Sequence, residues 1–369
     1  MTLRVTGKVV TPTGVFRQGC VEIVGDRIRA VAEYPTVRDG HWIVPGFVDM
    51  HTHGGGGHTF TTGDAESARQ AAEFHLGHGT TTLLASLVSS PFPLMREATA
   101  AYRPLVEAGV LAGVHFEGPY LSAARCGAQN PEFLRDPSTE ELTELIELGG
   151  GAVRMVTLAP ERDGALEAIK LLVGQGVVAA VGHTDATWEQ TRAAVAAGAS
   201  VGTHLFNGMR PVHHREPGPV VALLDAPNVV CELVADGVHL HDGMLGFATS
   251  VAGPDRAALI TDAMAAAGMP DGEYELGGQG VTVADGVARL SRDGAIAGST
   301  LTMDAALRHA VAAGIALPDA CRMVATTPAR AIGLGDRVGA LQPGLRADLV
   351  VLDDDLNVVR VMRAGAWVE

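Results

Sequence analysis

Short apolar runs alternate with helical segments through the middle of this chain, and this order constrains the fold more than any other feature. Eight runs have the character of buried strands: FVDMH, TTLLASLV, LAGVHFE, RMVTLAP, VVAAVGH, SVGTHLF, VVCELVAD and AALITD. Helical segments such as AESARQAAEFHLGHG and TWEQTRAAVAAG lie between them. Alternating strands and helices are typical of parallel βα units, and eight such units close a barrel. The sequence therefore predicts an α/β fold built on a (β/α)8 TIM-like barrel.

The two ends of the chain differ from the middle. Residues 2–43 and the C-terminal ADLVVLDDDLNVVRVMRAGAWVE both consist of short alternating runs separated by turn signals. We therefore predict a small β-sandwich domain formed from residues 1–46 together with 337–369, beside a barrel of residues 47–336. A glycine-rich alternating stretch predicts a β-hairpin flap near residues 270–298.

Composition excludes several classes of partner. The formal net charge is −15 and there is no run of Lys or Arg, so neither nucleic acid nor an anionic membrane is expected as a partner. No apolar run approaches the roughly 18 residues of a membrane span, and the N-terminus lacks the pattern of a signal peptide. The four cysteines are widely scattered, which suits reduced thiols and predicts a cytoplasmic protein.

Imidazole and carboxylate side chains close the predicted strands. His51 and His53 end the first strand, where alternate residues point to the same side. Active-site residues of such barrels come from the C-terminal ends of the strands. A single histidine there could be a hydrogen-bonded core residue. Several imidazoles and carboxylates together favour a metal site, because unpaired buried charge is unfavourable. The predicted ligands are His51, His53, Glu117, His183, His204 and Asp262.

This ligand set also indicates which metal and which chemistry to expect. Imidazole with carboxylate suits Zn²⁺, with Fe²⁺, Mn²⁺ or Co²⁺ as alternatives. Six ligands exceed one tetrahedral site, so one or two ions per subunit are expected. A divalent metal would activate water, and a carboxylate would then move the proton from nucleophile to leaving group. Asp262 is the candidate for this general base and acid. The run Gly54–Gly57 predicts close passage of the backbone past a ligand.

Several motifs resemble a known group of enzymes. PGFVDMHTHG is similar to the first-strand signature of the amidohydrolase superfamily. HFEGPYLS, GAQNP, VGHTDAT, THLFNGMRP, REPG, ADGVHL and LITDAM together resemble the N-acetylglucosamine-6-phosphate deacetylase family. The resemblance covers nearly the whole chain. It implies metal-dependent hydrolysis of the N-acetyl group of N-acetylglucosamine 6-phosphate, giving glucosamine 6-phosphate and acetate.

The resemblance also implies roles for particular residues. Glu117, His183 and His204 would hold the principal ion, whereas His51 and His53 would support a second one.

Substrate contacts are implied as well. Asn207 and Gly208 would contact the substrate, and Arg215 and His239 would bind its 6-phosphate. Because the arginine can come from the neighbouring subunit in this family, a homodimer is the corresponding expectation.

Two positions depart from the family pattern. Gln129 stands where some members have histidine, so it could donate a hydrogen bond to the substrate but could not act as an acid. Cys126 stands where lysine is familiar, on a polar loop that could line the substrate entrance.

Two alternative functions stay open at this point. One is another amidohydrolase, dihydroorotase-like or isoaspartyl-dipeptidase-like, which commonly bridges two metals with a carboxylated lysine on the fourth strand; RMVTLAP contains no lysine. The other is a non-catalytic barrel assembly protein, which should show gaps in its ligand set, and none is visible.

Overall fold

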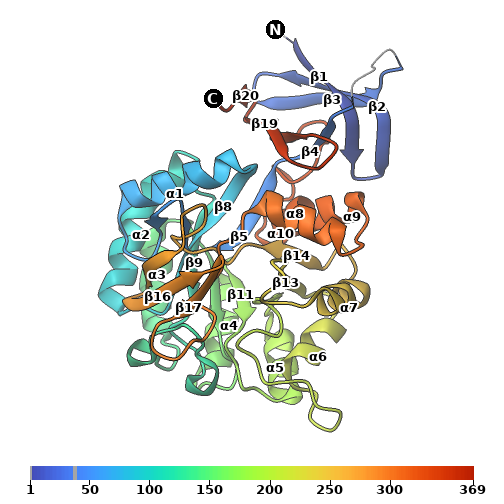
Figure 1. Ribbon diagram of the computed structural model, residues 1–369. Coiled ribbons are helices and arrows are strands. Elements are labelled where there is room, and N and C mark those ends of the chain that lie inside the picture. The colour runs from blue at the N-terminus through green and yellow to red at the C-terminus, as the bar shows by residue number, and fades with distance from the viewer. Residues whose placement is uncertain (1, 36–39) are drawn as a thin grey trace.

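A barrel of eight parallel strands forms the centre of the protein (Figure 1), in a computed structural model that describes residues 2–35 and 40–369. The strands follow one another in chain order around the barrel. The last strand closes onto the first, because the backbone N–H of Asp262 donates to His51 O over 2.9 Å and that of His53 to Ala263 O over 2.7 Å. The predicted (β/α)8 barrel is therefore confirmed. Its strands are β5 (Phe47–Thr52), β8 (Thr80–Leu87), β9 (Gly113–Glu117), β10 (Val153–Leu158), β11 (Val178–Val181), β12 (Val201–Gly202), β13 (Val230–Val234) and β14 (Ala257–Ile260).

Helices cover the outside of the barrel, each with one apolar face turned inward. The first of them buries Ala68, Ala71, Ala72 and His75, which recur at helical spacing along one side. No helix in the described ranges is both long and apolar enough to cross a membrane. The helices are α1 (Ala65–Gly77), α2 (Phe92–Glu107), α3 (Thr139–Gly149), α4 (Ala165–Gly174), α5 (Trp188–Ala197), α6 (Gly218–Asp225), α7 (Asp242–Ala252), α8 (Met303–Ala312), α9 (Leu317–Cys321) and α10 (Thr327–Ala331).

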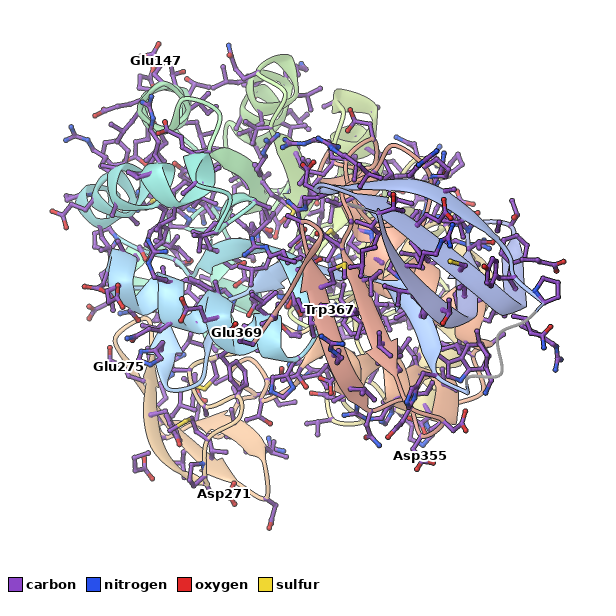
Figure 2. All side chains as sticks on the ribbon, turned by 90° about the horizontal axis from the view of Figure 1, so that it is seen from above. Glu147, Asp271, Glu275, Asp355, Trp367 and Glu369 are labelled. Carbon is purple, nitrogen blue, oxygen red and sulfur yellow. The ribbon has the colours of Figure 1, made fainter. Side chains whose placement is uncertain are left out.

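The predicted small β domain, built from both ends of the chain, is also confirmed. Both termini lie on it (Figure 1), and Trp367 packs against its core (Figure 2). Its strands form one continuous sheet, and residues from both halves, such as Val21 and Leu349, share one buried cluster. In spatial order the strands are β20 (Ala366–Trp367), β19 (Val358–Arg363), β18 (Leu349–Leu352), β4 (Trp42–Pro45), β1 (Thr2–Thr11), β2 (Gly14–Val24) and β3 (Arg27–Glu33).

An antiparallel sheet follows the last barrel strand, in the region where a hairpin flap is expected. It has three strands, β15 (Gly272–Leu276), β16 (Gln279–Ala284) and β17 (Val287–Leu290). Its inner side chains, Leu276 among them, pack against Val88 and Met264 at the barrel mouth. The outer edge, with Asp271 and Glu275, projects from the body of the molecule (Figure 2). We call residues 272–290 the flap.

A buried carboxylate joins the small sheet to the base of the barrel. Asp348 is 3% exposed, pairs with Arg346, and accepts a 2.8 Å hydrogen bond from the backbone N–H of Ala364. Arg346 also donates to the hydroxyl of Thr82 at the start of β8, over 2.8 Å. One ion pair therefore connects both parts of the molecule.

Removing this carboxylate should destabilise the fold. We expect Asp348→Ala to lower the free energy of unfolding by about 2 kcal/mol, because it leaves the Arg346 guanidinium without its charged partner. The matched control is Asp354→Ala, since Asp354 is exposed where it pairs with Lys8; we expect a change below about 0.5 kcal/mol. Urea unfolding of both variants measures the difference, and equal effects would contradict the assignment.

Candidate active site

The structure brings all six predicted ligands together at the C-terminal mouth of the barrel. They form two groups of three, and the ligand atoms within each group lie within 4.8 Å of one another. All six side chains are buried. The first group is His51, His53 and Asp262, and the second is Glu117, His183 and His204.

Strained backbone directs three of these side chains inward. His183, His204 and Asp262 follow the ends of β11, β12 and β14 with φ angles of 44°, 26° and 49°. Residues with a Cβ atom rarely adopt such left-handed conformations, and those that do cluster at functional sites. These strands therefore end in turns with strained backbone conformations, which place the three side chains in the site.

Glu117, the last residue of β9, lies between the two groups. Its Oε1 is 2.9 Å from His183 Nε2 and 2.8 Å from His204 Nε2, and its Oε2 is 3.2 Å from His53 Nε2. Burial alone would raise the pKa of this carboxyl, but the neighbouring imidazoles of His51 and His183 outweigh it and hold the pKa well below its ordinary value. Glu117 is thus an ionised carboxylate shared by both groups.

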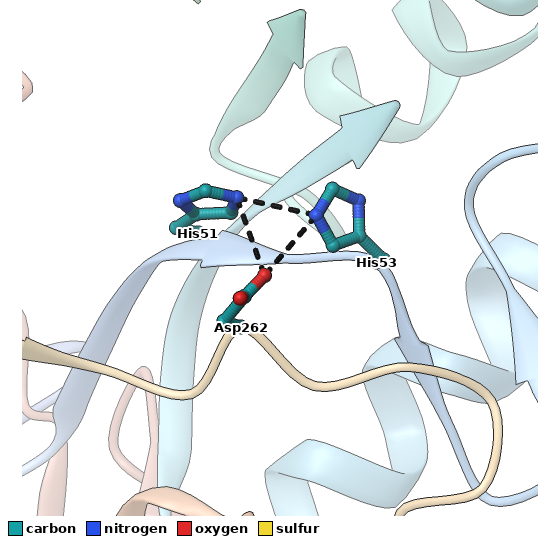
Figure 3. A group of neighbouring side chains, drawn as sticks. All are labelled: His51, His53 and Asp262. Atoms are coloured by element: carbon teal, nitrogen blue, oxygen red, sulfur yellow. Dashed lines mark hydrogen bonds and ion pairs between the residues drawn. The ribbon is translucent and has the colours of Figure 1, made fainter. Parts of the chain in front are cut away.

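Figure 3 shows the group formed by His51, His53 and Asp262. The two imidazole Nε2 atoms are 3.2 Å apart, and Asp262 Oδ1 is 3.5 Å from that of His51 and 3.3 Å from that of His53. Burial acts to raise the pKa of Asp262, but its hydrogen bond with His53 and the nearby imidazole charges lower it well below the ordinary value. Asp262 is therefore an ionised carboxylate at neutral pH.

The outer nitrogens of the histidines fix which ring atom faces the centre. His183 Nδ1 donates to Arg125 O over 2.9 Å, and His53 Nδ1 donates to Ser86 O over 3.0 Å. A carbonyl only accepts, so each of these rings carries its proton on Nδ1 and, when neutral, presents the Nε2 lone pair inward.

The same holds for His204, whose Nδ1 donates to Asn207 O over 3.2 Å. His183 Nε2 and His204 Nε2 lie 3.1 Å apart, and both lie within 2.9 Å of Glu117 Oε1, so two inward-facing nitrogens and one carboxylate oxygen meet at one place. These residues therefore fit a divalent cation at each group.

Two carboxylates that hold histidine rings at this site were not predicted from the sequence. Glu232 in β13 is fully buried; its Oε2 accepts from His51 Nδ1 over 3.0 Å and from the backbone N–H of His204 over 3.1 Å. Asp236 accepts from His239 Nδ1 over 2.7 Å. The available signal was a lone charged residue within the apolar run VCELV. Such a residue faces the barrel interior only if it has a partner there.

A cavity of about 210 Å³ opens beside the two groups. Four predicted substrate residues line it: Gln129, Asn207, Gly208 and His239. Gln129 is 2% exposed and held in place, because its Nε2 donates to Glu117 Oε2 over 2.7 Å and its Oε1 accepts from Ser89 N. The flap contributes Leu276 to the wall.

Glycine is required at position 208. Its φ is 60°, and a Cβ atom there would lie 2.8 Å from His183 Nδ1. The glycine run at 54–57 lies close to α1, and none of its residues lines the cavity. A Cβ at Gly55 would collide with the ring of Phe74 on α1, and one at Gly56 would be in tight contact with it. Close passage of this run past a ligand stays a prediction.

Two predicted site residues lie away from the cavity wall. Arg215 is exposed on the loop leading into α6, where its Nη1 is 2.8 Å from His214 Nε2. Cys126 is half-buried beside the cavity-lining Gly127 but does not itself line the cavity. The other three cysteines are buried, and all four are free thiols.

Comparison with known proteins agrees with this geometry. Residues 42–368 match the amidohydrolase family. The chain belongs to that family. The N-acetylglucosamine-6-phosphate deacetylase of Lysinibacillus sphaericus is 36% identical over 355 residues, covering 95% of this chain and 91% of the relative. The N-acetylgalactosamine-6-phosphate deacetylase of Escherichia coli O157:H7 is 38% identical over 367 residues, covering 97% of each.

A solved structure extends the comparison to three dimensions. It is a mutant N-acetyl-D-glucosamine-6-phosphate deacetylase of Mycobacterium smegmatis, in complex with N-acetyl-D-glucosamine 6-phosphate. That protein is 48% identical to this chain, covers 99% of both chains and superposes with a TM-score of 0.96. Its similarity therefore extends over both the barrel and the small sheet.

Protons should compete with metal at this site. Burial would lower the pKa of His53, but its hydrogen bonds with Asp262 and Glu117 raise it to about 9 in the metal-free protein. Metal binding must displace that proton, so apparent metal affinity should weaken progressively as the pH falls below about 9. Competition with a chromophoric chelator between pH 6 and about 9.5 measures this trend. An affinity independent of pH would contradict it.

Glu232 offers a second test of the site. We expect Glu232→Gln to weaken metal binding about tenfold, because a carboxamide keeps the shape of the side chain but removes the charge that supports His51. The control is Glu161→Gln, which changes a carboxylate that bonds Thr184 and Asp185 outside the two groups. Metal content after dialysis against a chelator should fall in the first variant and not in the control.

Proposed function

We propose that this chain hydrolyses the N-acetyl group of N-acetylglucosamine 6-phosphate to glucosamine 6-phosphate and acetate. One observation carries the proposal: the cavity is bordered by both ligand groups, in a chain that is 48% identical over 99% of its length to a deacetylase solved with that substrate. The rival hydrolases that use a bridging lysine are disfavoured, because β10 contains none.

The metal roles follow from the two groups. Glu117, His183 and His204 would hold the principal ion, and His51, His53 and Asp262 would hold a second one. Zn²⁺ is the proposed ion, with Fe²⁺, Mn²⁺ and Co²⁺ as alternatives that a metal analysis distinguishes. When bound, such an ion lowers the pKa of water toward about 7 and polarises a carbonyl oxygen.

Asp262 is the proposed proton carrier. It lines the cavity, and its second oxygen, Oδ2, lies 3.9 Å from His239 Nε2, so it borders the space that substrate would occupy. Asp262 would take a proton from the attacking water and give it to the amide nitrogen as the C–N bond breaks. Water thus supplies the oxygen of acetate, and the amine leaves with the transferred proton.

Asp262→Asn tests this role. We expect turnover to fall at least about 100-fold, because an amide cannot accept the proton. Acetate release is measured after saturation with Zn²⁺, beside metal content, which should stay within twofold of about one or two ions per chain. A variant that keeps both its metal and its activity would remove Asp262 from this role.

The sugar specificity needs a direct comparison. N-Acetylgalactosamine 6-phosphate differs from the proposed substrate only at C4, and a deacetylase for that epimer is 38% identical to this chain. Acetate release from the two epimers and from unphosphorylated N-acetylglucosamine ranks the candidates. Release only from a cyclic amide or a dipeptide would overturn the proposal in favour of another amidohydrolase activity, and a metal-free inactive chain would favour an assembly protein.

Substrate would be held by cavity residues and by a second subunit. Asn207, Gly208, His239 and Gln129 are the proposed contacts within one chain, with Cys126 near the entrance. Among the described residues that line the cavity, none is Lys or Arg. A phosphate group favours guanidinium, so Arg215 on its exposed loop is the proposed partner, supplied by the other subunit of a homodimer.

An apolar strip supports the proposed homodimer. Met244, Phe247 and Val251 on α7 are 38%, 50% and 44% exposed, and their spacing places them on one face of the helix. Large exposed apolar side chains in a row are typical of an interface, and a second copy is the proposed occupant. We further propose that this dimer acts in the cytoplasm.

Mixed dimers test whether Arg215 acts across the interface. We expect Arg215→Ala and Asp262→Asn homodimers each to be inactive at low substrate concentration. Co-expression with two different affinity tags yields a dimer in which one of the two sites has both native residues. Its activity should recover clearly above that of either parent. Failure to recover would place Arg215 in its own subunit or outside the site.

A further inference from the structure

A second cavity lies at the other end of the barrel from the candidate active site. Its volume is about 170 Å³, and it is lined by residues at the N-terminal ends of the barrel strands, including Thr82 of β8 and Arg154 of β10. The remaining wall comes from the end of α2 and the segment that follows it, from the segment between α10 and β18, and from the end of β19. The cavity therefore lies where the barrel meets the small sheet.

Four arginines line this cavity, and no carboxylate does. They are Arg154, Arg337, Arg346 and Arg363. The only acidic side chain that the structure pairs with any of them, within the described ranges, is Asp348, which binds Arg346. Four positive charges thus face one negative charge, in a chain whose formal net charge is −15.

Two of these arginines have structural partners. Arg346 bonds Asp348 and Thr82, and Arg363 donates to the carbonyl of Val110 over 3.2 Å and to that of Gly109. Burial lowers the pKa of Arg363 below its ordinary value, and the charge of Arg346 adds to this effect. The cations therefore destabilise one another where they stand.

The other two arginines, Arg154 and Arg337, have no structural partner of this kind among the described residues. Neither Arg154 nor Arg337 forms an ion pair with any residue in the described part of the chain, and Arg154 Nε is buried with no hydrogen-bond partner. A buried donor without a partner is unfavourable, and so is a cluster of like charges. An anion in the cavity would relieve both.

We propose that this cavity binds a small phosphate group, either free inorganic phosphate or the phosphomonoester of a metabolite. Guanidinium presents paired N–H donors that match phosphate oxygens, and several arginines around one anion are typical of phosphate sites. Arg154 comes from the barrel and Arg363 from the small sheet, so the bound anion would tie these two parts together and stabilise the fold.

Binding is tested on metal-loaded protein with inorganic phosphate, at constant ionic strength set by chloride. We expect phosphate to raise the Tm and to give a measurable Kd by calorimetry. Arg154→Gln and Arg337→Gln should each raise that Kd about tenfold, because each removes a charge-assisted hydrogen bond. Arg337 is exposed, so its variant should fold even if the Arg154 variant does not.

The matched control is Arg96→Gln, which removes an exposed cation paired with Glu144 on the barrel surface. It should leave the phosphate Kd unchanged. Phosphate that fails to stabilise the native protein beyond chloride overturns the proposal, as does a Kd that survives in the Arg154→Gln/Arg337→Gln double variant. This readout is independent of turnover, so the proposal can fail while the deacetylase assignment holds.

A competition arm identifies the source of the phosphate group. Glucosamine 6-phosphate and glucose 6-phosphate are titrated against bound inorganic phosphate in the native protein and in the Arg96→Gln control. Displacement in both proteins assigns the cavity to a phosphorylated metabolite. Absence of displacement, with inorganic phosphate still bound in an arginine-dependent way, assigns it to free phosphate.

Discussion

Glu117 is the constraint on which the barrel mouth depends. A buried carboxylate is tolerable only with compensating partners, and this one contacts His53, His183, His204 and Gln129 directly. These partners come from different strands and loops, so their correct placement requires the whole barrel to close. The backbone hydrogen bond from Asp262 to His51 at the closing seam joins two residues that also form the site. The site can therefore form only when the barrel is closed.

Hydrogen-bond partners around the site fix the protonation of the histidine rings. Backbone carbonyls of Ser86, Arg125 and Asn207 fix the protonated nitrogen of three rings, which directs the other nitrogen inward. Positive φ angles at His183 and His204 show that the backbone bears strain to keep them there. Cations at the two groups would neutralise the carboxylates and separate the facing lone pairs, so the same arrangement explains both the strain and the chemistry.

The sequence predicted those features that depend on local pattern. Apolar runs defined the eight strands, and the rule that strand ends point to one mouth placed His51, Glu117 and Asp262 at the same end of the barrel, where the structure has them. The sequence did not predict features that depend on packing between distant segments. Glu232 looked like part of an apolar strand, and Gly55 and Gly56 pack against Phe74 of a helix whose position no local pattern gives. The second cavity was hidden for the same reason, because its arginines lie between positions 154 and 363.

The two ends of the barrel distribute positive charge in opposite ways. The mouth has no Lys or Arg among its described lining residues, although the proposed substrate carries a phosphate, whereas the base has four arginines around one cavity. In a chain with a net charge of −15, phosphate cannot be attracted by the overall field and must meet placed cations. This deficit at the mouth is the reason for proposing that a second subunit supplies a cation, because Arg215 lies on an exposed loop and does not line the cavity of its own chain. The arginines at the base pair with one carboxylate among the described residues, Asp348, and a bound anion is the further compensation that we propose.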